Sequence, residues 1–104
     1  MMVTVIEIGT TDFESDEMII KKAMSHLQTQ CGIINGYQFS EPVSRFGWTF
    51  FKLALNPGLL DGIEKKFSDM VRRYKGKPPE KILSFLSDYF ESRGCKTKLK
   101  MIDA

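Results

Sequence analysis

The sequence has no long apolar run and no basic leader segment. Its longest apolar stretches, such as residues 18–20 and 53–55, fall far short of the ~20 residues that span a bilayer. The first ten residues, MMVTVIEIGT, carry an acid inside their apolar run, and no basic segment precedes that run. This pattern is typical of a strand and not of a secretion signal. We therefore expect a cytoplasmic protein that makes no membrane contact.

Cysteine is scarce, and the chain has no CxxC pair. Cys31 and Cys95 are far apart in the sequence, which favours two free thiols in a reducing compartment over a disulfide or a metal pair. Each cysteine adjoins a glycine at the expected end of a helix. The negative end of a helix dipole raises a thiol pKa, so we expect neither cysteine to be reactive.

Catalytic and cofactor motifs are also missing. His26 is the only histidine, and the sequence has neither HxxxH spacing nor a glycine-rich phosphate loop nor a nucleophile elbow. The acids at 12, 14, 16 and 17 lack the turn glycine and terminal glutamate of a calcium loop, and capping of a helix explains them better. We predict no catalytic residue, no metal ligand and no cofactor. An enzyme whose site is shared across a dimer stays open.

Apolar and aromatic residues, by contrast, are plentiful. The 104 residues are 42% hydrophobic and include eight Phe, three Tyr and one Trp. A chain of this size buries roughly two-thirds of its extended surface on folding, which is enough for a core without disulfides or metals. The net charge is only +2, so the composition as a whole does not indicate nucleic-acid binding. We expect one domain over residues 1–104.

Local patterns predict elements in the order β-α-β-β-α-α-β. The expected strands are 2–9, 33–40, 48–55 and 95–102, and the expected helices are about 15–30, 57–75 and 79–93. Asn56 and Pro57 are a cap and a first helical residue. The order indicates an α+β, ferredoxin-like (split β-α-β) two-layer sandwich with helices on one face of a sheet. Two consecutive helices leave the direction of the last strand open and could produce a mixed sheet.

The sheet face that the helices leave uncovered is the candidate contact surface. Alternation along 48–55 places Phe51, Leu53 and Leu55 toward the helices, because successive strand residues point to opposite faces. The same reasoning applies to the first and last strands. The residues predicted to form the open face or its contacts are Val3, Val5, Trp48, Phe50, Lys52, Lys96, Lys98 and Lys100.

Residues 47–53, GWTFFKL, resemble the third-strand motif of RNA-recognition motifs, a glycine followed by aromatic, small, aromatic and apolar residues. The resemblance covers these seven residues only. Phe46 stands where that family has a basic residue, and the first strand has Thr4 or Val5 where an aromatic would stack a second base. The resemblance implies single-stranded RNA as a partner, with bases on the rings and phosphates on the lysines.

Self-association is the other interpretation of the same face. Small sheet domains often cover an open face with a second copy, and one self-complementary patch suffices for a two-fold dimer. Trp48, Phe50, Val3 and Val5 would then be the interface core, and the lysines of the last strand would protect an edge. From the sequence we favour a non-catalytic binding or assembly module that forms a homo-oligomer or binds another protein. A single-stranded nucleic-acid binder is the alternative.

Overall fold

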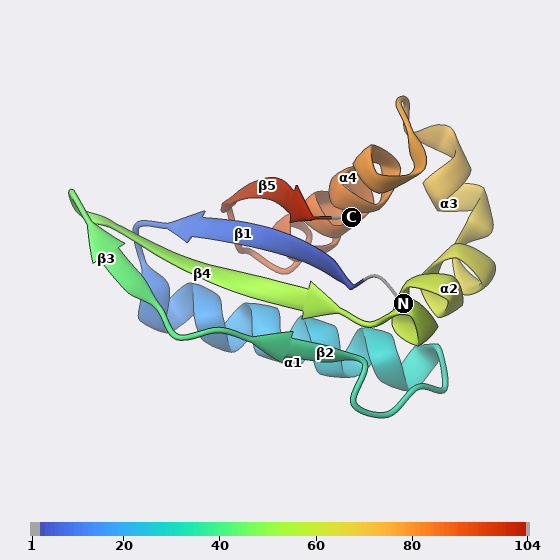
Figure 1. Ribbon diagram of the computed structural model, residues 1–104, viewed down its shortest axis with the longest axis horizontal. Helices are drawn as coiled ribbons and strands as arrows, with labels where there is room; N and C mark the ends of the chain where they lie inside the picture. Colours follow the sequence, from blue (N-terminus) through green and yellow to red (C-terminus); the bar gives the residue numbers. More distant parts are fainter. Residues whose placement is uncertain (1–2, 104) are drawn as a thin grey trace.

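The structure is a computed structural model that describes residues 3–103 of the chain. Within this range, five strands and four helices form an α+β fold (Figure 1). The elements are β1 (Thr4–Thr10), α1 (Phe13–Gln30), β2 (Tyr37–Phe39), β3 (Val43–Arg45), β4 (Trp48–Leu55), α2 (Pro57–Lys66), α3 (Ser68–Arg73), α4 (Pro78–Glu91) and β5 (Lys98–Asp103). Residue 2, which the sequence placed in the first strand, lies outside the described residues.

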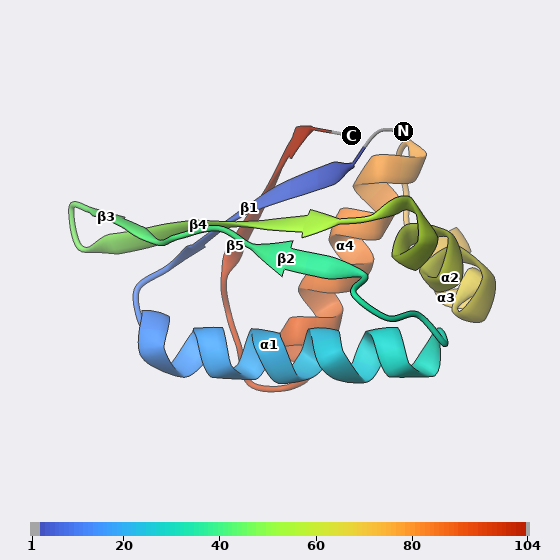
Figure 2. The ribbon, with the colours of Figure 1, turned by 60° about the horizontal axis from the view of Figure 1, so that its bottom comes forward.

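The sheet is antiparallel throughout, with the strand order β2-β4-β1-β5. The structure therefore decides against the mixed sheet, which the sequence had left open as one possibility. Helices α2 and α3 lie together near the end of the sheet where β4 finishes, and only α4 carries the chain back along the sheet (Figures 1 and 2). The extra helix thus adds no crossing, and β5 returns antiparallel to β1.

The outer edge beside β4 is a strand broken in two, where the sequence predicted one strand followed by a loop. β2 pairs with the second half of β4 and β3 pairs with its first half. Between them, the Ser40 N–H donates to the carbonyl of Lys52 at 2.9 Å, and the Lys52 N–H donates to Ser40 Oγ at 2.8 Å. Pro42 has no N–H to give, so the ladder resumes only at Val43.

The helix predicted over 57–75 begins as expected and then breaks. The Leu59 N–H donates to Asn56 Oδ1 at 2.8 Å, which is the predicted cap. At Phe67 the backbone leaves helical geometry (φ −115°, ψ 33°), and α3 starts after it. β5 begins at residue 98 instead of 95, so Lys96 lies before the strand and not in it.

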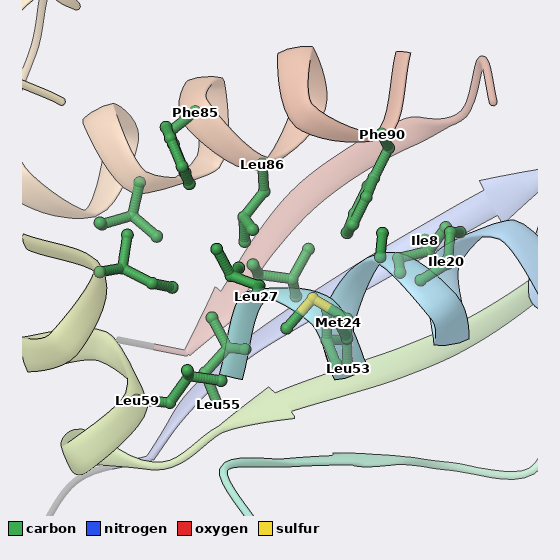
Figure 3. Packing of buried hydrophobic residues seen from close by; sticks show 14 of the residues in the cluster. Ile8, Ile20, Met24, Leu27, Leu53, Leu55, Leu59, Phe85, Leu86 and Phe90 are labelled. Atoms are coloured by element: carbon green, nitrogen blue, oxygen red, sulfur yellow. The ribbon is translucent and has the colours of Figure 1, made fainter. Parts of the chain in front are cut away.

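The core lies between the sheet and the helix layer. Side chains of α1 and α4 point toward β1 and β4, and Leu59 of α2 closes one end (Figure 3). The labelled residues, all 3% exposed or less, are Ile8, Ile20, Met24, Leu27, Leu53, Leu55, Leu59, Phe85, Leu86 and Phe90. Because α1 and α4 lie on the same side of the sheet (Figure 2), no helix formed by residues 3–103 covers the opposite side.

Candidate binding face on the open side of the sheet

The side of the sheet away from the helices is defined by strand alternation and by register. In β4, Phe51, Leu53 and Leu55 are buried while Lys52 is exposed, as the sequence predicted. Residues directly opposite each other on neighbouring strands share a face. The pairings therefore place the following residues on what we call the outer face: Val5, Glu7, Gly9, Gln38, Val43, Arg45, Trp48, Phe50, Lys52, Ala54, Lys98 and Lys100.

Two aromatic rings form the centre of this face. Trp48 and Phe50 lie two residues apart on β4, and their rings are stacked with centroids 6.3 Å apart and planes 20° apart. Both rings are half-buried. Gly9, the register partner of Phe50 on β1, has no side chain, so the rings cover its backbone. The pair is an aromatic platform at the centre of a face that also carries Val5, Val43 and Ala54.

Each ring has a cation over it, supplied by a different strand. The guanidinium carbon of Arg45, from β3, lies 5.3 Å from the centroid of the Phe50 ring. Lys98 Nζ, from β5, lies 5.2 Å from the Trp48 ring centroid. Cation–π contacts of this kind contribute about 0.5–1 kcal/mol at exposed sites. They also hold positive charge beside the rings, where an anionic ligand would meet it.

A row of charged side chains crosses the sheet beside the aromatic platform. Glu7 of β1 is the register partner of Lys52 on β4 and of Lys100 on β5. Together with Arg45 and Lys98, these lysines give the outer face four cations, against Glu7 and a second carboxylate, Glu41, which lies between β2 and β3. The face is therefore positively charged, although the whole chain carries a net charge of only +2.

The break between β2 and β3 leaves a hollow of about 420 Å³ in the outer face. Its lining includes Glu7, Glu41, Val43, Arg45, Phe50 and Lys52. A volume of this order lies within the ~300–1,000 Å³ typical of small-ligand sites. The hollow combines one aromatic ring with charges of both signs, so it fits a flat polar group better than an aliphatic one.

The turn that joins β3 to β4 is unusual in its sequence. Arg45 and Trp48 are register partners, so the loop has two residues, Phe46 and Gly47. Both have positive φ, +53° and +81°. Turns of this kind favour Asn, Asp or Gly at the first position, and a left-handed backbone costs another residue about 1–2 kcal/mol. Phe46 is also 99% exposed, so packing does not compensate for that cost.

The structure brings together most of the predicted contact residues. Trp48, Phe50, Lys52, Lys98 and Lys100 share the outer face with Val5. Val3 is exposed and precedes β1, and it lines a smaller hollow beside Gln38 and Ala54. Lys96 was wrongly placed in the last strand, because that strand starts two residues after it.

Sequence reasoning missed Arg45 and Phe46. Both lie in a segment that was predicted to be a loop. Arg45 comes to lie over the Phe50 ring only because β3 pairs with β4. A Phe-Gly dipeptide between two expected strands is a recognisable departure from the usual Asn-Gly turn. That departure was the available clue.

The remaining chemistry-bearing residues lie elsewhere. His26 is exposed on α1, with its Nε2 3.0 Å from Gln30 Nε2. Burial and, to a smaller extent, the Asp16 carboxylate raise the pKa of the Cys95 thiol to about 12. Cys31 and Cys95 are both free thiols. Within residues 3–103, no group of three or more His, Cys, Asp or Glu side chains is placed to hold a metal ion.

None of the helices in the described range is long and apolar enough to cross a membrane. Comparison of the chain with protein-family models, with curated proteins and with solved structures finds no match in any of the three.

Proposed function

We propose that the chain is a non-catalytic binding module that uses the outer face of a ferredoxin-like scaffold to bind single-stranded nucleic acid. The antiparallel order β2-β4-β1-β5 with helices on one side supports the scaffold, because it leaves one whole sheet face open. We also propose a reducing, cytoplasmic compartment, which the free thiols of Cys31 and Cys95 support.

The observation that carries the nucleic-acid proposal is the Trp48–Phe50 stack with Arg45 and Lys98 over its rings. Every base has an aromatic face that can stack on such rings, and every nucleotide brings a phosphate that needs a cation. The resemblance of residues 47–53 to the third strand of RNA-recognition motifs points the same way.

Charge is the reason for placing nucleic acid ahead of self-association. Two copies joined face to face would bring four cations and two carboxylates, Glu7 and Glu41, against the same set. A negatively charged partner avoids that repulsion and is attracted to the cations of the outer face.

Self-association remains a second candidate because apolar side chains surround the platform. Val3 is 40% exposed and Val43 is 55% exposed. Val43 is the register partner of Phe50, so it extends the apolar surface beside the rings. A second copy shifted along the strands would bury these side chains and place some lysines opposite Glu7.

Two measurements separate the candidates. The first is the change in fluorescence of Trp48, the only tryptophan, on titration with a single strand of about 12 nucleotides, within the ~4–16 that such domains cover. The second is the molar mass in solution by size exclusion with light scattering. A monomer whose Trp48 signal responds to the strand supports the proposal. A stable dimer whose Trp48 fluorescence does not change on addition of the oligonucleotide contradicts the nucleic-acid proposal and favours self-association.

A matched pair of variants makes the test specific. Arg45→Gln removes the cation over Phe50, and Arg93→Gln removes a similar cation, 4.0 Å from the Tyr89 ring on the helix side. We expect Arg45→Gln to weaken binding and Arg93→Gln to leave it unchanged. Equal effects would show that binding follows total charge and not the outer face.

A further inference from the structure

The first residue of the β3–β4 turn has a side chain that the fold does not use. Phe46 occupies a left-handed conformation that its own side chain disfavours, and its ring is 99% exposed. The turn would form more readily with asparagine at this position. A large apolar ring kept at the price of both backbone strain and full exposure is a candidate contact residue.

Phe46 lies in the turn that leads directly into the strand carrying the aromatic platform. Phe46, Trp48 and Phe50 follow one another at alternate positions, with the first in the turn and the other two stacked on the outer face. In both views the β3–β4 hairpin extends beyond the first turn of α1, so its tip projects from the body of the molecule (Figures 1 and 2). A nucleic-acid strand bound over Trp48 and Phe50 would reach the Phe46 ring if it continued along the hairpin.

The charges beside the turn indicate what kind of partner meets the ring. Arg45 precedes Phe46, and Lys98 lies over the ring of Trp48, which follows the turn. An exposed aromatic ring on a hairpin that also has these cations over its other two rings fits a ligand that alternates flat rings with negative charges. A purely apolar partner would leave Arg45 and Lys98 desolvated without a counter-charge.

We propose that Phe46 is a binding residue that stacks on a base of the bound single strand, next to the platform of Trp48 and Phe50. The inference rests on the proposed function. It adds Phe46 as a third stacking ring and gives the direction in which the bound nucleic acid lies. The strand would run along the β3–β4 hairpin toward its tip.

The test uses two substitutions at one position. Phe46→Asn supplies the residue that the turn favours, so we expect a higher melting temperature together with roughly 5- to 100-fold weaker binding of a strand of about 12 nucleotides. Phe46→Trp keeps an aromatic ring and should retain the wild-type affinity. Opposite movement of stability and affinity in Phe46→Asn is a result that a purely structural role would not give.

The outcomes distinguish this inference from the proposed function. If the wild type binds the strand and Phe46→Asn binds equally well, Phe46 has no such role and the platform proposal stands. If the wild type binds no strand, both fail. If Phe46→Asn leaves strand affinity unchanged and lowers the molar mass in solution, the ring belongs to a contact between proteins and the inference is overturned.

Discussion

Gly9 and Phe50 face each other across β1 and β4, and the Phe50 ring occupies the space that a side chain at Gly9 would fill. A Cβ added to Gly9 would lie 3.0 Å from Cε1 of Phe50 and 3.6 Å from Cε3 of Trp48. The position of the aromatic pair therefore depends on a residue of another strand. This makes Gly9 a means of moving the platform without altering either ring.

We expect Gly9→Ala to shift the Phe50 ring by a few tenths of an ångström, and the stacked Trp48 ring with it, because a Cβ contact of 3.0 Å is tighter than most real ones. The emission of Trp48 should shift, and strand binding should weaken. Gly58→Ala is the control, since its added Cβ would meet only Asn56 Oδ1 at 3.4 Å. Unchanged emission in Gly9→Ala would show that the rings do not rest on this backbone.

The cations that flank Glu7 should determine the salt dependence of binding. Each phosphate contact on a single strand contributes about 0.7 to the slope of log affinity against log salt. The double variant Lys52→Gln and Lys100→Gln should therefore reduce that slope by about 1.4. Lys65→Gln removes a lysine that already pairs with Asp61 at 3.0 Å on α2, and it should leave the slope unchanged. Titrations at several salt concentrations would show whether the two variants differ.

Local patterns were sufficient for the parts of this fold whose structure depends on nearby residues. The cap at Asn56, the alternation along β4 and the apolar stripes of α1 and α4 are such features. β3 could not be predicted, because Val43–Arg45 is three exposed residues that become a strand only by pairing with β4. The cations over Trp48 and Phe50 depend on that pairing and on the register of β5, so the contact of Arg45 with the Phe50 ring could not be derived from local patterns.

The two thiols should differ in reactivity. Burial raises the pKa of Cys31, and the Lys66 ammonium partly offsets this, while Cys95 is buried with a pKa of about 12. In the native protein at neutral pH we expect slow labelling of Cys31 by a disulfide reagent. Cys95 should label only when the chain unfolds. Labelling of native Cys31→Ser at the rate of the wild type would contradict this assignment.

The contact between Tyr74 and Asp88 predicts how stability falls at high pH. Tyr74 follows α3, and its hydroxyl donates to Asp88 Oδ2 on α4 at 2.5 Å. Burial first, then this hydrogen bond and the carboxylate charge, raise the pKa of Tyr74 from 10.0 to about 12. Because the folded state holds this proton more tightly than the unfolded state, the contribution is complete below pH 10.0 and is lost as the pH rises to about 12.

Denaturant unfolding across this pH range tests the assignment. Tyr74→Phe should be less stable than the wild type below pH 10.0 and should lose less stability between there and about pH 12. Asp88→Asn removes the carboxylate charge but not the burial, so it should lower the pKa of Tyr74 only part of the way, as tyrosinate absorbance would report. Equal alkaline loss in Tyr74→Phe and the wild type would mean that another group, such as Tyr89, carries the effect. Burial raises the pKa of Tyr89 as well, while Arg93 lowers it.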